Sequence, residues 1–300
     1  MALMNIQSSI CGVCRQFWVV AAAAVAGGAI FFAGCSTMNK HNEGKLGLQL
    51  YSLRTQLGAN LGALDEVRSW GIKYVELAGT YGKTPEEFKG ELAKRGLVAV
   101  SGHFSFEEWS RDPDAVIAQA EKLGLTYVGC AWIPHNDPFD EATCRNAAAV
   151  FNHAGEVAAA HHMTFFYHTH GYEFVPHGSG TLFDLLLSET KPELVKLQMD
   201  IFWIAHAGQD PVQLLREHPD RFELMHVKDM RRGTEVNLTG HSDVNNDVAM
   251  GEGSLPLPAI LNAGKSIGIK YYFIEDESAA SEQQIPRSVA YLKKYVGAEL

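Results

Sequence analysis

Four short apolar runs in the second half of the chain each end on a residue that can bind a metal ion. The four end residues are His168, Asp200, His226 and Glu275. Short apolar runs are typical of buried parallel strands, and the parallel strands of an α/β barrel carry their catalytic side chains at their C-terminal ends. Two imidazoles and two carboxylates would therefore meet on one face, where they form a ligand set for a divalent metal ion.

The elements that would place these residues follow a repeated order of helix, glycine and strand. Gly71, Gly96, Gly124 and Gly268 each stand where a helix C-cap needs a positive φ, and a strand-like run follows each of them. Helix starts are marked by a capping residue before proline, as at Thr84-Pro85. The pattern predicts strands over residues 46–51, 74–77, 97–103, 127–131, 163–168, 197–201, 222–227 and 271–275. The clearest helices are expected over residues 85–95, 113–123 and 140–161.

Eight β/α units predict a (β/α)8 TIM barrel, a single α/β domain over residues 46–300. A doubly wound open sheet is the competing fold. It usually has fewer strands, and no Gly-x-Gly-x-x-Gly or phosphate-loop pattern follows a predicted strand here. The longest non-helical insertion, residues 230–258, lies between the seventh and eighth strands, and we expect substrate contacts there.

The N-terminal segment, residues 1–34, has the features of an export signal. An apolar stretch over residues 17–33 follows Arg15 and leads through small residues into Cys35. This resembles the lipobox of a bacterial lipoprotein signal, which predicts a lipid anchor at Cys35, a polar tether over residues 35–45 and a periplasm-facing protein. A plain membrane anchor, or a cleavable signal with an incidental cysteine, is the alternative. Removal of the signal would leave a length that suits one barrel of about 250 residues.

The charge of the chain argues against nucleic acid as a partner. The formal net charge is −10, and nucleic-acid binding relies on Lys and Arg to neutralise phosphates. Beyond the signal, Cys130 and Cys144 are the only cysteines besides Cys35, so no disulfide framework is indicated. We expect a small-molecule sugar as partner and membrane contact only through the lipid anchor. The sequence leaves the oligomeric state open.

Five short motifs at successive strand ends carry a family resemblance. They are Tyr167 to His170 with Glu173 and Phe174 following, Met199-Asp200, His226 to Asp229, Gly251 to Gly253, and Ile274 to Asp276. In this order they resemble the xylose isomerase-like barrel superfamily, often labelled sugar phosphate isomerase/epimerase. The resemblance covers nearly the whole chain after the signal, and it implies one metal ion held by His168, Asp200, His226 and Glu275. Mixed nitrogen and oxygen ligands suit manganese, cobalt, zinc or magnesium.

Two positions depart from the family pattern. Many members have a glutamate where His168 stands, and in the epimerases that glutamate and the one matching Glu275 transfer protons on opposite faces of the substrate. Many members also have a histidine three residues after the strand-six aspartate, where this chain has Trp203, and the next histidine is His206. The resemblance therefore implies the metal site more firmly than it implies epimerisation.

The remaining candidate residues lie near strand ends. We expect Glu275 to act as the first base and Lys228 as the second proton-transfer group, with His170 in reserve. Lys228 follows His226 by two residues on the same strand face, and a nearby cation with partial burial would lower its pKa. A rim ion pair is the alternative role for Lys228. The candidates for substrate contact are Glu76, His103, Trp132, Glu173, Trp203 and His206.

These residues predict a metal-dependent sugar isomerase or epimerase that works through an enediolate on an unphosphorylated sugar or keto-sugar. Elimination or hydration at a keto-glycoside is the close alternative, because His168 replaces one of the paired bases. A non-catalytic sugar-binding lipoprotein is an alternative of a different class and predicts retained aromatic residues without a metal ion. The uncharged substrate is expected because phosphorylated sugars are scarce outside the cytoplasm.

Overall fold

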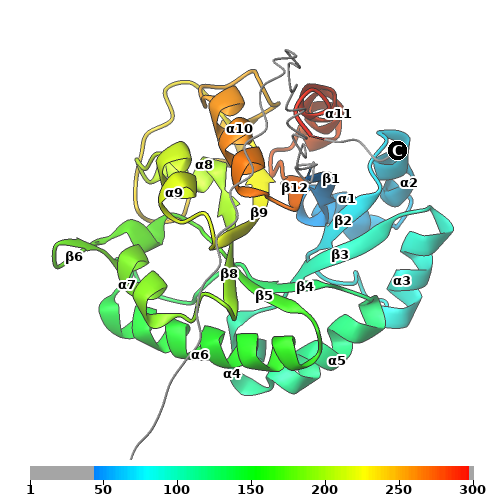
Figure 1. The fold of residues 1–300 in the computed structure, drawn as a ribbon. Coiled ribbons are helices and arrows are strands. Elements are labelled where there is room, and N and C mark those ends of the chain that lie inside the picture. Colours follow the sequence, from blue (N-terminus) through cyan, green and yellow to red (C-terminus); the bar gives the residue numbers. More distant parts are fainter. Residues whose placement is uncertain (1–43, 297–300) are drawn as a thin grey trace, which may run out of the picture. The chain divides into compact units, whose positions relative to one another are not determined.

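The computed structural model describes residues 44–296, which fold around a closed barrel of parallel strands (Figure 1). The predicted (β/α)8 barrel is confirmed, and two strands have the predicted bounds. The predicted signal, the anchor at Cys35 and nearly all of the tether lie outside the described residues, so they stay predictions. Around the barrel the strands are β1 (Lys45–Gln49), β12 (Tyr271–Ile274), β9 (Phe222–Val227), β8 (Val195–Asp200), β5 (Thr164–His168), β4 (Tyr127–Cys130), β3 (Val98–His103) and β2 (Tyr74–Leu77).

Helices lie around the outside of the strands (Figure 1). Their starts follow the sequence signals: in the first turn of α3, Glu87 N–H donates to Thr84 Oγ1 at 3.2 Å and Thr84 N–H donates to Glu87 Oε2 at 2.9 Å. Helix α5 ends as expected at Gly124, whose φ is 80°. The helices are α1 (Arg54–Ala59), α2 (Ala63–Ser69), α3 (Pro85–Lys94), α4 (Phe106–Arg111), α5 (Pro113–Leu123), α6 (Glu141–Ala160), α7 (Leu182–Glu189), α8 (Ile201–His206), α9 (Pro211–Glu217), α10 (Leu257–Ile267) and α11 (Ser281–Leu292).

Short elements occupy three of the loops at the C-terminal ends of the strands. The predicted non-helical insertion after β9 carries a small antiparallel sheet, in which Asp229 pairs with Val248. The short elements are η1 (Leu50–Leu53) after β1, η2 (Tyr172–Phe174), β6 (Pro176–His177) and β7 (Gly180–Thr181) after β5, and β10 (Asp229–Met230), η3 (Val244–Asn246) and β11 (Asp247–Val248) after β9.

The interior of the barrel is filled by apolar side chains below the strand ends. Phe166, Leu224 and Phe273 are fully buried, and each precedes a strand-end residue by two positions. Because side chains alternate along a strand, they share the inward face with the strand-end residues. Gly129 and Gly47 leave space for them, since an added Cβ at either glycine would overlap the ring of Phe166 or Phe273. The polar strand-end residues therefore stand on a packed apolar floor.

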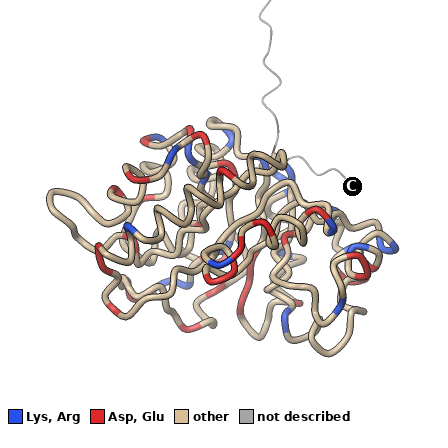
Figure 2. The backbone as a smooth tube through the Cα atoms, turned by 90° about the horizontal axis from the view of Figure 1, so that it is seen from below, with Lys and Arg blue, Asp and Glu red and all other residues tan. Residues whose placement is uncertain are grey.

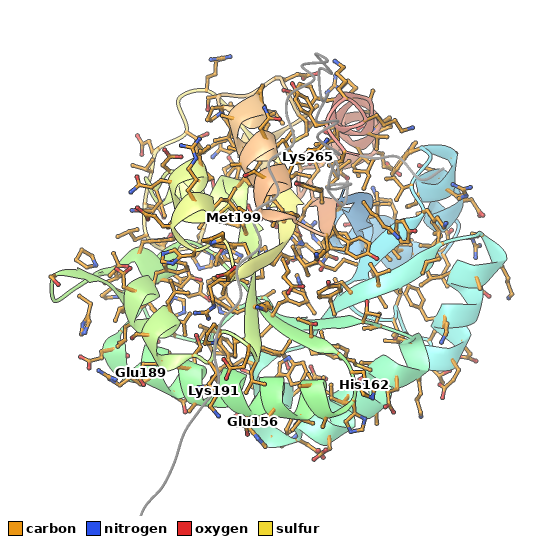
Figure 3. All side chains as sticks on the ribbon, in the orientation of Figure 1. Glu156, His162, Glu189, Lys191, Met199 and Lys265 are labelled. Atoms are coloured by element: carbon orange, nitrogen blue, oxygen red, sulfur yellow. The ribbon has the colours of Figure 1, made fainter. Side chains whose placement is uncertain are left out.

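Charged residues are spread over the outer layer. Figure 2 shows acidic and basic positions interspersed along the described helices and loops. In Figure 3, Glu156, Glu189 and Lys191 are labelled beside α6 and α7, and Lys191 Nζ lies 2.6 Å from Glu156 Oε1. Exposed pairs of this kind contribute little to stability. Within residues 44–296, no helix is both long enough and apolar enough to cross a bilayer.

Candidate active site

The four strand-end residues expected to bind a metal ion lie together at the C-terminal mouth of the barrel, and we call them the ligand cluster. The strand register explains this, because Asp200 pairs with His226 across β8 and β9. His168 Nε2 and His226 Nδ1 each lie 3.8 Å from Asp200 Oδ2. His226 Nδ1 lies 3.1 Å from Glu275 Oε2, and all four side chains are buried. The structure thus brings together the predicted ligands.

The donor set and its spacing fit a divalent metal ion. Ligand atoms that are each about 2.0–2.2 Å from a metal lie roughly 3–3.5 Å from one another. The separations of 3.1 and 3.8 Å in the ligand cluster are close to that range. Asp200 Oδ2, which faces the other ligands, is buried and accepts no hydrogen bond among the described residues, although Lys228 Nζ lies 3.3 Å away. A buried carboxylate oxygen that accepts no hydrogen bond is costly, and a bound cation would satisfy it more fully.

Gln198 lies between two imidazoles and orients them. Its Oε1 accepts hydrogen bonds from His168 Nδ1 at 2.9 Å and His103 Nε2 at 3.1 Å, and its Nε2 donates to Glu76 Oε2 at 2.8 Å. Because an amide oxygen only accepts, His168 carries its proton on Nδ1, and its Nε2 lone pair faces Asp200. A histidine that binds a metal is usually fixed in this way, by a hydrogen bond from its other nitrogen.

Glu76 lies beneath His226 and not in the pocket, which corrects the expectation that it contacts substrate. Its fully buried carboxylate accepts hydrogen bonds from Gln49 Nε2 at 2.8 Å and Ser101 Oγ at 2.5 Å, and it also contacts His226 Nε2. Burial would raise the pKa of Glu76, but the rings of His103 and His226 lower it to about 2. Glu76 therefore stays charged and holds His226 with Nδ1 facing the ligand cluster.

Lys228 is buried among carboxylates. Its Nζ donates to Glu275 Oε2 at 2.7 Å and Glu277 Oε1 at 3.0 Å, and it lies 3.3 Å from Asp200 Oδ2. Burial would lower the pKa of Lys228, but the charges of Asp200, Glu275 and Glu277 raise it well above its usual value. The neighbouring carboxylates therefore oppose the lowering of the pKa that was expected from burial and a nearby cation. Lys228 is an ammonium group that holds the carboxylates together.

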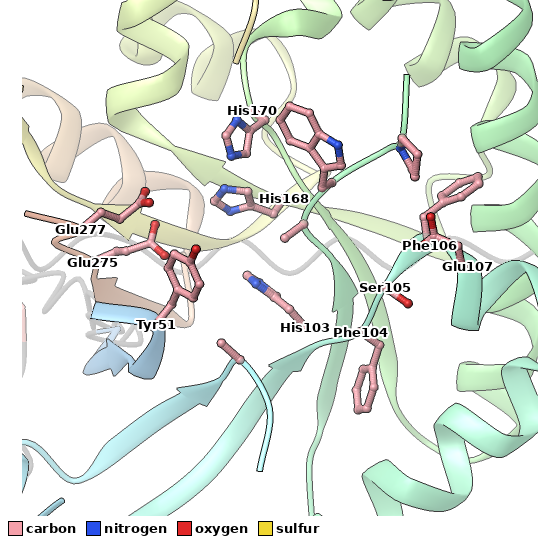
Figure 4. A pocket seen from close by; sticks show the side chains of 14 residues that line it. Tyr51, His103, Phe104, Ser105, Phe106, Glu107, His168, His170, Glu275 and Glu277 are labelled. Carbon is pink, nitrogen blue, oxygen red and sulfur yellow. The ribbon is translucent and has the colours of Figure 1, made fainter. Parts of the chain in front are cut away.

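A cavity of about 450 Å³ opens beside the ligand cluster (Figure 4). The carboxylates of Glu275 and Glu277 line one side, and the imidazoles of His103, His168 and His170 lie next to them. His103 is thus placed where the sequence predicted a substrate contact, and Trp132 lines the same cavity. Among the described residues that line the cavity there is no Lys or Arg, so a phosphate group would meet acidic and neutral side chains.

His170 lines the cavity but is neutral. Burial and the charge of Lys228 lower the pKa of His170 to about 3. Its ring stacks on Trp203 with centroids 4.4 Å apart and meets the edge of Trp132 at 5.0 Å. A neutral imidazole is a poor proton donor, so the position suits hydrogen bonding to a ligand better than the reserve acid role.

Three other residues predicted to contact substrate lie outside the cavity. Glu173 is buried and accepts a hydrogen bond from the backbone N–H of His170 at 2.9 Å, so it holds the loop that carries this histidine. Trp203 lies behind His170. His206 is buried and stacks on Phe202, with ring centroids 5.6 Å apart. The structure therefore gives these three residues supporting positions and corrects the prediction of direct contact.

The insertion between β9 and α10 packs behind the cavity wall. The ring of His241 lies 5.2 Å from that of Trp132, centroid to centroid. Gly240, with φ 69°, approaches so closely that a Cβ there would lie 3.1 Å from His170 Nδ1. Among the described residues, none from 230–258 lines the cavity, so the expected substrate contacts from this loop are replaced by support of Trp132 and His170.

The sequence reasoning missed three residues that shape the site. Glu277 and Tyr51 line the cavity, and Gln198 orients the imidazoles. Glu277 follows Glu275 by two positions, and Gln198 precedes Asp200 by two. An extended chain has a side-chain period of two, which could have indicated both residues. Tyr51 is the last residue of the strand predicted over residues 46–51, so its place at a strand end could have indicated it too, although β1 ends at Gln49 in the structure.

Comparisons with known proteins agree with the fold. Residues 64–295 match the family described as xylose isomerase-like TIM barrel. An inosose dehydratase of Clostridium botulinum (strain Eklund 17B / Type B) is 28% identical over 193 residues, which cover 56% of this chain and 63% of that protein. The chain therefore spans less than two thirds of the length of that relative.

Two solved structures show the same fold. A sugar phosphate isomerase/epimerase from Parabacteroides distasonis ATCC 8503 has a TM-score of 0.70 at 23% identity, covering 85% of this chain and 96% of that chain. The crystal structure of the IOLI protein with a binding zinc atom has a TM-score of 0.62 at 16% identity, covering 84% of this chain and 96% of that chain.

Proposed function

Because this chain belongs to the xylose isomerase-like TIM barrel family, we propose that it is a metal-dependent enzyme that eliminates a group from an uncharged keto-sugar or keto-polyol. The observation that carries the proposal is the one-sided cavity. At the end that holds the ligand cluster, the carboxylates of Glu275, a member of the cluster, and of the neighbouring Glu277 lie on the same side of the cavity (Figure 4). Elimination suits this arrangement, because one carboxylate can take a proton and return it to the leaving group on the same face. The dehydratase among the relatives supports this reading.

The ligand cluster would hold the metal ion, with manganese, cobalt, zinc and magnesium as candidates. When bound, such an ion would supply Lewis-acid polarisation of the substrate carbonyl. The zinc atom in the IOLI structure is consistent with a divalent ion in this family. Gln198 and Glu76 would keep two ligand imidazoles in the required orientation, through their contacts with His168 and His226.

Glu277 is the residue that we assign to proton transfer. It lines the cavity, and its Oε1 accepts a hydrogen bond from Lys228 Nζ at 3.0 Å. Glu275, the base expected from the sequence, has its Oε2 shared between Lys228 and His226 and belongs to the ligand cluster. Glu277 therefore has fewer contacts with other charged side chains than Glu275 has.

The reaction at Glu277 would proceed in two steps. Its carboxylate takes the proton from the carbon next to the carbonyl, and the C–H electron pair moves towards the carbonyl oxygen. The pair then returns to form a C=C bond, the C–O bond on the adjacent carbon breaks, and the departing oxygen takes the proton from Glu277. The products are an α,β-unsaturated ketone and water or an alcohol, and the carboxylate is regenerated.

Glu277→Gln is expected to lower kcat by about a hundredfold or more, the usual scale for losing a general acid–base group. The amide keeps an oxygen for the hydrogen bond from Lys228, so the metal content should stay at the level of the parent. Steady-state kinetics and metal analysis of the purified variant check both points. Glu193→Gln changes an exposed glutamate and should leave both unchanged. An unaltered kcat for Glu277→Gln at full metal content would contradict the assignment.

Isomerisation is the second candidate, favoured by the name of the Parabacteroides distasonis protein. One carboxylate can carry a proton between neighbouring carbons on the same face of an enediol, so the one-sided cavity accommodates this reaction too. Epimerisation is less well supported, because it needs a second proton-transfer group on the opposite face. A non-catalytic sugar-binding protein would leave the cluster of buried ligands around Asp200, whose Oδ2 accepts no hydrogen bond among the described residues, without a role.

The proposed function predicts metal-dependent turnover of keto-sugars without phosphate. Incubation of the purified protein with keto-sugars and keto-glycosides should yield an ultraviolet-absorbing unsaturated ketone, and a chelator should stop its formation. A phosphorylated counterpart should have a kcat/KM about tenfold lower or less, because Glu275 and Glu277 would repel its charge. A product of unchanged mass would favour isomerisation. Sugar binding without turnover, by a protein that takes up no metal ion, would overturn the enzymatic reading.

A further inference from the structure

The cavity extends beyond the ligand cluster to an end with a different chemistry. Figure 4 shows Glu275 and Glu277 at one end, the three imidazoles in the middle, and Phe104 and Phe106 at the other. We call this second part the distal end. Its lining residues come from the loop after β3, the first turn of α4 and the loop after β4, and are Phe104, Ser105, Phe106, Glu107, Trp132 and Pro134.

The aromatic side chains of the distal end are held in place by packing. Trp132 contacts the rings of His135 at 5.1 Å and Tyr172 at 4.9 Å, measured between centroids. Phe106 packs edge-on against the buried ring of Phe151 at 6.0 Å. The apolar surface is therefore formed before a ligand arrives, so binding orders little further.

The distal end offers few hydrogen bonds to a ligand. The hydroxyl of Ser105 donates to Glu108 Oε2 at 2.8 Å and accepts from Glu108 N–H at 3.2 Å, so it is already used in the cap of α4. Among the side chains that line the distal end, the exposed carboxylate of Glu107 is the hydrogen-bond acceptor left for a ligand. A sugar ring on the aromatic side chains would therefore leave most of its hydroxyl groups without a protein partner, which is unfavourable. An aryl or alkyl group has no hydroxyl groups that need hydrogen-bond partners, and it would gain contact with the aromatic faces.

We propose that the distal end binds an apolar aglycone, and that the substrate is a keto-glycoside carrying an aryl or similar group. The placement of the sugar beside the ligand cluster rests on the proposed function. A cavity of about 450 Å³ lies in the usual range for sites that enclose such a ligand, about 300–1,000 Å³. The link between sugar and aglycone would lie near the imidazoles, between the two ends.

Calorimetric titration of the metal-loaded protein tests the distal end without requiring turnover. The ligands are phenyl β-D-glucoside, methyl β-D-glucoside and cellobiose, none of which carries a ketone that could react. We expect the phenyl glycoside to bind at least about tenfold more tightly than the other two, because only its ring can pack on the aromatic side chains. Equal affinities, tighter binding of cellobiose, or no detectable binding of the phenyl glycoside would overturn the proposal.

Two truncations and a control locate the effect. Phe106→Ala and Trp132→Ala should each bring the ratio of phenyl to methyl affinity close to one, whereas Val98→Ala removes apolar surface at the opposite end of β3 and should keep it. If both variants fold and still bind the phenyl glycoside more tightly than the methyl glycoside, the phenyl group binds elsewhere and the proposal is overturned. The turnover assay tests the proposed function separately. If the protein prefers the phenyl glycoside but does not catalyse elimination, only the proposed function is contradicted. If it catalyses elimination without that preference, only the aglycone site is contradicted.

Discussion

Replacing Asp200 with asparagine is expected to empty the metal site and to lower kcat/KM by about a thousandfold or more. Asp200 Oδ2 faces the other three ligands and accepts no hydrogen bond among the described residues, and Lys228 Nζ lies 3.3 Å from it. The substitution replaces the carboxylate with an amide, whose NH2 group donates hydrogen bonds. The metal ion would then lack the anionic oxygen that it needs at this position. Lewis-acid polarisation is worth several kcal/mol at the transition state, and about 4 kcal/mol corresponds to a thousandfold in rate.

Asparagine is a sharper test than alanine at this position. Asp200 Oδ1 also caps α8, where it accepts hydrogen bonds from Phe202 N–H at 2.8 Å and Trp203 N–H at 3.1 Å. Alanine would remove this cap, which typically costs about 1 kcal/mol, whereas asparagine is an equally good capping residue. Asp200→Asn therefore separates the metal from the helix, and Asp200→Ala should lose both.

Metal analysis of the purified variants checks the prediction, with Asp220→Asn as the matched control. Asp220 is exposed and precedes the N-terminal end of β9, at the other end of the barrel from the ligand cluster. Its replacement should change neither metal content nor turnover. If Asp200→Asn retains the metal content of the parent, the ligand cluster is assigned wrongly.

Lys228→Met is expected to destabilise the metal-free protein by about 3–5 kcal/mol, the usual cost of removing one partner from a buried ion pair. The methionine would leave Asp200, Glu275 and Glu277 buried or half-buried without their ammonium partner. A bound divalent cation would offset part of this repulsion. The variant should therefore gain more thermal stability from metal than the parent does. Turnover should also fall by about a hundredfold, because Glu277 loses the hydrogen bond that positions it.

Denaturant unfolding with and without a chelator measures the free energy of unfolding in both states. Lys122→Met is the matched control, since Lys122 is exposed and forms only a surface pair with Glu86 at 3.3 Å. It should leave stability and turnover nearly unchanged. Equal stability of Lys228→Met and the parent without metal would mean that the three carboxylates do not depend on Lys228. Unchanged turnover at full metal content would return Lys228 to a purely structural ion pair.

The barrel and its ligand cluster could be predicted because they depend on local and periodic features. Glycine caps end the helices, apolar runs fill the strands, and parallel strands present their C-terminal ends on one side. His168, Asp200, His226 and Glu275 therefore needed only correct strand ends to be brought together. The strands predicted over residues 74–77 and 222–227 have those bounds in the structure.

The roles of the neighbouring residues were decided by the tertiary structure. Glu76 belongs to a strand like the ligands do, but the close approach of His226 and Ser101 places it below the cavity. Lys228 shares a strand face with His226, yet three carboxylates from β8 and the end of β12 determine its charge. A sequence gives the side of a strand on which a residue lies, but not which charges other strands bring to it.

Beyond the strand ends the side chains no longer alternate with a period of two, and the turns of the backbone decide which side chains reach the cavity. Gly171, with φ 94°, turns the chain so that Glu173 caps backbone N–H groups instead of facing a ligand. Helix α8 starts directly after Asp200, so Trp203 and His206 follow helical directions and pack against aromatic rings. The sequence by itself determined the fold and, through repeating spacing, the residues of the ligand cluster, whereas loop conformation and contacts between strands decided which other side chains line the cavity.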